Sequence, residues 1–327
     1  MLQRKTLWIL CPLACVAIGF LACDKQEVYR EVDYNRITAI VNDNFNLSSF
    51  AVALDRTGMD EVLQEEEGPF TVLIPSDEAF RHSGLSNVRT MSAARLGPLV
   101  NYHILNGRYE LEKFPYLLNQ EIQSKGGKLY VSRWIKGADT VLSINGARVV
   151  LKDLPASNGR IQIINRVLEP YAHETLAEAA MADTTTLFVE ALRRCGLMDT
   201  LRGPGPYTVF APSNHAMRRF GYASIQQVKE ANPAVLRALC EFHIGPDRRF
   251  VNDYILSTGS SHIGSQRMIN TFTVTVKLIP NSSEPSGFSG IRLAAPGNTT
   301  DVNISRQDIL AGNGVLHIVD DVLRLTR

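Results

Sequence analysis

Apolar and polar residues follow the same order in two separate stretches of the chain. Residues 70–80, FTVLIPSDEAF, begin with a mostly apolar run that predicts a strand covered on both faces. Pro75 ends this strand, and Ser76 can cap a helix whose first turn holds two acidic residues. Residues 207–217, YTVFAPSNHAM, predict the same strand-to-helix junction. Its matching residues are Pro212 and Ser213.

Further blocks recur in the same order along the chain, so the two stretches belong to a long repeat. Because the repeat is much longer than the unit of a solenoid, it indicates a tandem duplication of a whole domain. We expect domain 1 at residues 36–171 and domain 2 at 172–327. The other matching blocks are 50–63 with 188–201, 96–105 with 236–245, and 157–170 with 312–325.

One histidine of each domain has the spacing of an apolar helix face. Leu96, Leu99, Val100 and His103 stand at i, i+3, i+4 and i+7, and His243 closes the same pattern in domain 2. We expect both imidazoles to be buried and bonded to backbone. A catalytic or metal-binding role would need partner residues that the repeat does not supply.

The last block of each domain predicts a hairpin followed by a final strand. An Asn-Gly pair is a strong signal for a hairpin turn. His317 stands where domain 1 has Gln162, so it is not shared between the copies. We expect it at the surface or packed within the hairpin. The two turns are Asn158-Gly159 and Asn313-Gly314.

The composition of the chain excludes several classes of function and kinds of site. The 34 basic and 33 acidic residues leave no net field that would attract nucleic acid. Cys195 and Cys240 both lie on apolar helical faces, and we expect buried free thiols rather than a disulfide. No Cys/His cluster has the spacing of a zinc site, and no motif indicates a cofactor. The sequence contains neither HExxH nor GxSxG.

The N-terminus resembles a bacterial lipoprotein signal. Residues 1–23 contain basic residues, then an apolar run too short for an ordinary membrane span, and end at Cys23. The sequence FLAC resembles a lipobox, although Phe replaces the usual Leu. We expect acylation of Cys23, a tether at 24–35, and an outer-membrane protein facing outward, with the periplasmic face as the alternative. An ordinary cleaved signal peptide or an uncleaved anchor would have a similar pattern.

The TVFAPSN junction, the YHI and FHI blocks and the NG ending resemble the fasciclin domain, in that order and twice, over residues 36–327. The resemblance implies an α+β fold: a wedge of two β-sheets with helices packed along one side. It also implies adhesion, or protein or glycan recognition, without established catalytic residues. Tyr102-His103 matches a motif implicated in cell attachment in animal relatives. We expect it to support conformation first.

The middle of each domain diverges most between the copies, and specific binding is expected where they differ. In domain 1, Tyr130 and Trp134 lie near basic residues and are candidate binding residues. Domain 2 has additional residues rich in Ser, Gly, Asn and Pro, which predict a longer variable loop at 257–300. Its candidate binding residues are Pro280 and Phe288.

Two classes of function remain open. The first is a non-catalytic cell-surface adhesion or binding module for an extracellular protein or glycan, held to the membrane by its lipid. Within this class, an accessory lipoprotein of an outer-membrane nutrient importer is the alternative. The second class is an extracellular hydrolase whose site is assembled only in the fold.

The anchor can be tested by substituting the acylated residue. Cys23→Ser should release the protein from the membrane fraction or leave an unprocessed precursor, because acylation requires the thiol. Detergent-phase partitioning and the mass of the processed protein measure this. A normal processed mass with unchanged partitioning would reject the lipoprotein interpretation.

Overall fold

The computed structural model describes residues 33–284 and 286–326. Residues 34–327 form one compact unit. The predicted signal peptide and most of the tether, including Cys23, lie outside the described residues.

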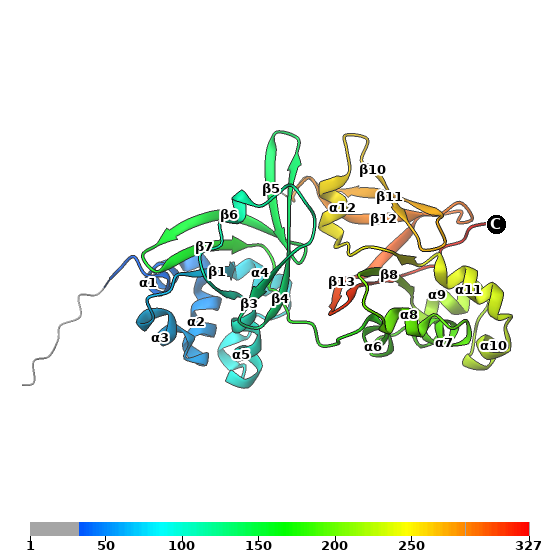
Figure 1. The fold of residues 1–327 in the computed structure, drawn as a ribbon, viewed down its shortest axis with the longest axis horizontal. Helices are drawn as coiled ribbons and strands as arrows, with labels where there is room; N and C mark the ends of the chain where they lie inside the picture. The colour runs from blue at the N-terminus through cyan, green and yellow to red at the C-terminus, as the bar shows by residue number, and fades with distance from the viewer. Residues whose placement is uncertain (1–32, 285, 327) are drawn as a thin grey trace, which may run out of the picture. The chain divides into compact units, whose positions relative to one another are not determined.

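Domain 1 begins with short helices and then alternates between strands and helices (Figure 1). Its helices are α1 Ile37–Asn42, η1 Phe45–Leu47, α2 Ser48–Thr57, α3 Met59–Glu65, α4 Asp77–His82, η2 Val88–Thr90, α5 Ala93–Tyr102 and η3 Leu111–Lys113. Its strands are β1 Phe70–Pro75, β2 Ile104–Asn106, β3 Gln120–Ser124, β4 Gly127–Lys136, β5 Asp139–Ile144, β6 Ala147–Ala156 and β7 Gly159–Ile164.

Domain 2 repeats this order, with α10 where domain 1 has η2 and α12 where domain 1 has η3. Its helices are α6 Leu176–Met181, α7 Thr186–Arg194, α8 Met198–Arg202, α9 Asn214–Phe220, α10 Ile225–Glu230, α11 Pro233–Glu241 and α12 Val251–Ser257. Its strands are β8 Tyr207–Pro212, β9 Ile244–Gly245, β10 Ile263–Arg267, β11 Thr273–Pro280, β12 Phe288–Ala294, β13 Val302–Ala311 and β14 Gly314–Val319.

The two domains have the same sheet topology. Domain 1 has the order β2-β1-β7-β6-β5-β4-β3, and domain 2 has β10-β11-β12-β13-β14-β8-β9, which is the same order read from the other edge. The central pairs β1–β7 and β8–β14 are parallel. β5 and β6 pair only at Ser143–Arg148 and Ile144–Ala147, so the sheet divides there into two parts. This confirms the expected α+β wedge with two β-sheet parts and helices beside them.

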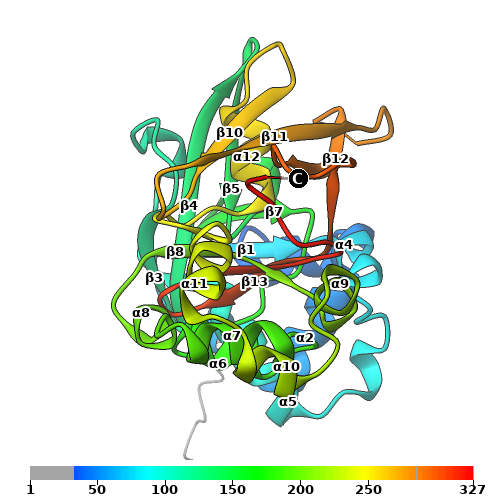
Figure 2. The ribbon, with the colours of Figure 1, turned by 90° about the vertical axis from the view of Figure 1, so that its right-hand side faces the viewer.

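Each domain has one core between helices and sheet and another between the two parts of the sheet. In domain 1, Phe50 of α2 and Val72 of β1 belong to the first core, whereas Leu73 and Leu129 belong to the second. Adjacent residues of β1 therefore face different cores, which explains why that strand is apolar on both sides. Figure 2 shows the equivalent arrangement in domain 2, with α7, α10 and α11 along one side of the sheet.

The predicted long loop at 257–300 is wrong. Three strands lie within this segment, β10, β11 and β12, and they pair in antiparallel order. Val274, Val276 and Leu278 alternate along β11 into the core, and this burial favours a strand over a loop. Pro280 and Phe288 pair with each other at the ends of their strands, beside the turn of the hairpin.

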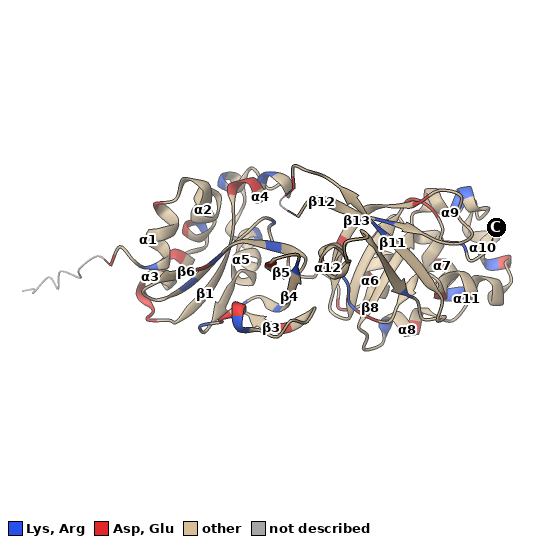
Figure 3. Ribbon diagram, turned by 90° about the horizontal axis from the view of Figure 1, so that it is seen from above, with Lys and Arg blue, Asp and Glu red and all other residues tan. Residues whose placement is uncertain are grey.

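Charged residues are dispersed over both domains. Figure 3 shows Lys and Arg interspersed with Asp and Glu along the chain, without a large region of one sign. Among the described residues, none of the helices is both long and apolar enough to span a membrane.

Candidate functional site

The two motif histidines make the same contacts in their respective domains. His103 Nδ1 lies 2.8 Å from the carbonyl oxygen of Leu99, and its Nε2 accepts the N–H of Leu168 at 3.0 Å. His243 makes equivalent bonds to Leu239 and Leu323 at the same distances. Both rings are fully buried. Because Nε2 accepts, the imidazole is neutral with its proton on Nδ1, and it ties a helix to the end of its domain.

The other repeated motif residues also hold backbone. Ser76 caps α4 by accepting the N–H of Ala79, and Ser213 does the same for Ala216. A Cβ on Gly159 would stand 2.1 Å from the carbonyl oxygen of Phe70, so only glycine fits beside β1. The prolines also match, because Pro75 ends β1 as Pro212 ends β8. Gly314 lies beside β8 as Gly159 lies beside β1.

The hairpin asparagines join each final hairpin to the first helices of its domain. Asn158 Oδ1 accepts the N–H of Ile37 at 3.0 Å, and its Nδ2 donates to Leu63 O at 2.7 Å. Asn313 bonds in the same way to Leu176 and Leu201. The amide groups of both asparagines are hydrogen-bonded to backbone within their domains, so they are not free to bind a ligand.

His317 is fully buried, so the surface position expected for it is wrong. It packs within its hairpin: Nδ1 accepts the N–H of Asp308 at 3.1 Å, and Nε2 lies 3.0 Å from Arg249 O. In domain 1, Gln162 Oε1 accepts the N–H of Asp153 at 3.0 Å. Asp153 and Asp308 both have a positive φ, and each lies where the register of its strand shifts. The backbone N–H of each aspartate therefore has no partner on the neighbouring strand, and a side chain accepts its hydrogen bond.

The four candidate binding residues do not form one site. Tyr130, one of these candidates, is buried, and the Arg248 guanidinium lies 3.6 Å from its ring centroid, so its ring face is covered. Trp134 is half-buried on β4, and Pro280 is exposed at the end of β11. The Phe288 ring packs against His262, with 4.9 Å between centroids.

A buried carboxylate joins domain 2 to domain 1. Asp253 of α12 is fully buried and accepts hydrogen bonds from Ser132 Oγ at 2.7 Å and Asn119 Nδ2 at 3.0 Å, both in domain 1. It also accepts the N–H of Phe250 at 2.8 Å. Burial raises the pKa of Asp253, and these hydrogen bonds oppose that shift by favouring the charged form.

A second polar contact lies nearby. Arg166 of domain 1 donates to Asp308 Oδ2 at 2.8 Å and to Gly146 O at 2.7 Å. The other oxygen of Asp308 accepts the N–H of Val251 at 2.7 Å. The Asp308 side chain is 3% exposed and that of Arg166 is 33% exposed, so the carboxylate end of this ion pair is shielded from water and the guanidinium end is partly hydrated.

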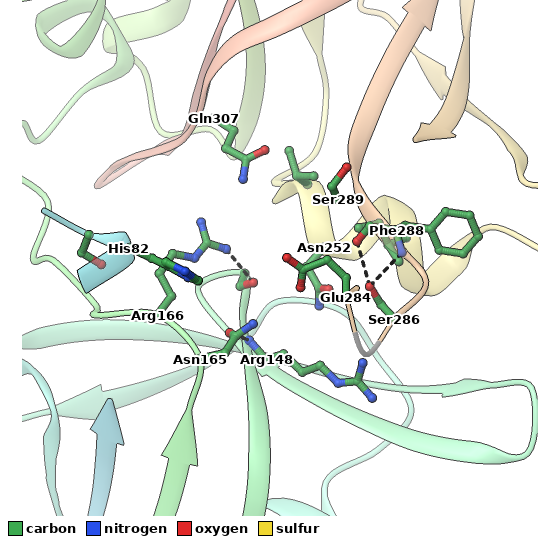
Figure 4. A pocket seen from close by; sticks show the side chains of 14 residues that line it. His82, Arg148, Asn165, Arg166, Asn252, Glu284, Ser286, Phe288, Ser289 and Gln307 are labelled. Carbon is green, nitrogen blue, oxygen red and sulfur yellow. Dashed lines mark hydrogen bonds between the residues drawn. The ribbon is translucent and has the colours of Figure 1, made fainter. Parts of the chain in front are cut away.

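Two cavities open where the domains meet, and they form the candidate functional site. One has a volume of about 300 Å³, and the other about 480 Å³. They share Ser83, Arg166 and Gln307, so we treat them as one junction groove. Figure 4 shows side chains of both domains around the first cavity, with the Phe288 ring turned away from it.

The described residues contain no group of three or more His, Cys, Asp or Glu side chains placed to hold a metal ion. Cys195 and Cys240 are both buried and unbridged. The polar character of the groove comes from its hydrogen-bonding and charged side chains.

The family model of the fasciclin domain matches residues 45–170 and 183–325. The chain belongs to the fasciclin-domain family. The two matches lie within domains 1 and 2, so the duplication consists of two fasciclin domains.

Three relatives match most of this chain. Transforming growth factor-beta-induced protein ig-h3 of Sus scrofa is 25% identical, with 82% of this chain and 36% of the relative covered. Stabilin-1 of Homo sapiens is 28% identical, and the match covers 84% of this chain and 10% of the relative. Fasciclin-1 of Drosophila melanogaster is 23% identical, and the match covers 83% of this chain and 42% of the relative. The chain thus spans less than half of each of these relatives.

A solved structure of a FAS1 domain pair from the insect cell adhesion molecule Fasciclin I is also similar. It is 19% identical, its TM-score is 0.41, and the match covers 85% of this chain and 96% of that one.

Sequence reasoning missed the residues that join the two fasciclin domains. Asp253 was detectable in part, because it is the one charged residue in the otherwise largely apolar stretch 250–256, FVNDYIL. A carboxylate in such a stretch needs buried hydrogen-bond donors. Its donors Asn119 and Ser132 lie far away in sequence and carry no comparable signal.

The buried histidines predict a loss of stability in acid. Burial lowers the pKa of His103 and His243 from 6.5 to about 4. Between these values the unfolded chain binds protons that the folded chain does not, so stability is full above pH 6.5 and falls toward pH 4. Each histidine contributes a slope of up to about 1.4 kcal/mol per pH unit. Urea unfolding at pH 7, 6, 5 and 4.5 measures it.

A double variant separates the two histidines from other titrating groups. His103→Gln with His243→Gln should reduce the dependence of the unfolding free energy on pH in this window, and the part due to His317, whose pKa burial also lowers, should remain. His82→Gln, at an exposed position of α4, is the matched control and should keep the slope. An unchanged slope in the double variant would contradict the assignment.

Proposed function

We propose that the protein is a non-catalytic adhesion or binding module that recognises an extracellular protein or glycan. It is held at the outer face of the outer membrane by a lipid on Cys23. The observation that carries this proposal is that two fasciclin domains make up nearly all of residues 36–327, the predicted mature part beyond the tether.

The roles of the motif residues support binding over catalysis. The histidines, serines and asparagines that recur in both domains are engaged with backbone, as His103 and Asn158 illustrate. A hydrolase would need a nucleophile, a carboxylate pair or a metal at an accessible site. In the junction groove, the carboxylates of Asp183 and Asp308 are each paired with an arginine.

The matched relatives support this proposal. Fasciclin-1 of Drosophila melanogaster and transforming growth factor-beta-induced protein ig-h3 of Sus scrofa match 83% and 82% of this chain, which covers both fasciclin domains for the most part. We extend adhesion to this chain as part of the proposal. The importer-accessory role is the alternative within the same class, and it differs in its expected partner.

Crosslinking on intact cells tests the proposal. We expect an extracellular or neighbouring-cell partner to be recovered with the wild-type protein and lost with Cys23→Ser, because the released protein is no longer concentrated at the surface. Recovery of an outer-membrane transporter would favour the importer-accessory role instead. Release of product from an extracellular polymer by the purified protein would overturn the non-catalytic assignment.

A further inference from the structure

The junction groove is large enough for more than one small chemical group. Its two cavities measure about 300 and 480 Å³, and ligand sites in proteins commonly begin at about 300 Å³. Arg166 of domain 1 and Gln307 of domain 2 line both cavities. Neither domain alone supplies the whole groove, so it exists only in the tandem pair.

The first cavity presents hydrogen-bond donors and acceptors in a mixture. Arg148 can only donate and Glu284 can only accept, whereas the amides of Asn165, Asn252 and Gln307 can do both. Among the described residues, neither Arg148 nor Glu284 forms an ion pair. Their opposite charges balance, so this part of the groove does not select an ion of one sign.

One donor in this cavity lacks an acceptor. The Nδ2 atom of Asn252 is buried, and no described residue accepts a hydrogen bond from it. Leaving a buried amide donor unpaired is unfavourable, and such groups usually have a partner in proteins or ligands. A turn of the Asn252 side chain toward the cavity would let a ligand oxygen accept from it.

The second cavity adds an aromatic ring, two charge pairs and the carboxylate of the exposed Glu169. Tyr171, half-buried in the segment between the domains, lines it. Arg166 pairs with Asp308, and Arg306 pairs with Asp183. A tyrosine ring offers an apolar face for a ligand that is polar at its edges.

We propose that the junction groove binds an extended, uncharged glycan. A sugar hydroxyl both donates and accepts, which fits the mixed amides, Arg148 and Glu284 better than a carboxylate or an apolar group would. The apolar face of a sugar ring fits against Tyr171. The two joined cavities take a chain of sugar residues rather than a single one. This inference rests on the recognition function proposed above.

Saturation-transfer NMR with oligosaccharides tests the inference on the chain from Asp24 to Arg327, which contains the whole compact unit. The probes are maltohexaose, cellohexaose and mannohexaose, with an acidic oligogalacturonate hexamer for comparison. At least one neutral hexasaccharide should bind, and it should bind more tightly than the acidic one.

Two variants locate the site. Asn252→Leu and Tyr171→Ala should each weaken binding of the neutral hexasaccharide about tenfold, the effect of losing one good contact. Asn87→Leu and Tyr34→Ala, at exposed positions outside the groove, are the matched controls and should bind as the wild type does. Thermal unfolding of every variant confirms that it is folded.

The inference is overturned if no neutral hexasaccharide binds at millimolar concentration, if the acidic hexamer binds more tightly, or if both groove variants bind normally. A protein partner recovered by crosslinking, together with no glycan binding, would reject this inference and leave the proposed adhesion function intact.

Discussion

The buried carboxylate of Asp253 is the contact on which the arrangement of the two domains depends. A charge removed from water is tolerated only when hydrogen bonds replace its hydration, and here Ser132 and Asn119 of domain 1 provide two of those bonds. If domain 1 moved away, Asp253 would lose two donors at once. A hydrogen bond to a charged group typically contributes about 1.5–3 kcal/mol, so these two bonds resist separation of the domains.

The duplication separates two kinds of residue. Those that recur in both copies, such as His103 with His243 and Asn158 with Asn313, hold the fold of each domain through backbone hydrogen bonds. The pair that joins the copies is formed only once: Arg166 pairs with Asp308 across the junction, whereas Asp153, the counterpart of Asp308, bonds to Gln162 of its own domain. The same hydrogen bonds therefore hold the fold of each domain, and the junction depends on contacts that the two copies do not make alike.

Local pattern was enough to predict the strand-to-helix junction and the helix that ends at the buried histidine. Alternating apolar residues, Pro75 and the cap at Ser76 specify a strand and a helix within a few positions, and the spacing of His103 specifies its burial. The role of Tyr130 was not predictable in this way. An aromatic residue near basic residues resembles an open binding platform, but Arg248, more than one hundred positions later, covers it. The 257–300 segment was read as a loop from its small polar residues, although its alternating apolar positions form strands.

Hydrogen–deuterium exchange of the Asp253→Ala variant is the most direct test of the claim that this carboxylate joins the domains. The account predicts faster exchange in residues 119–136 of domain 1, although the substitution lies in domain 2, because their contacts with α12 are lost. Asp301→Ala, a domain 2 carboxylate that pairs with Lys277, should leave that segment unchanged. Wild-type exchange in residues 119–136 of a folded Asp253→Ala protein would contradict the account.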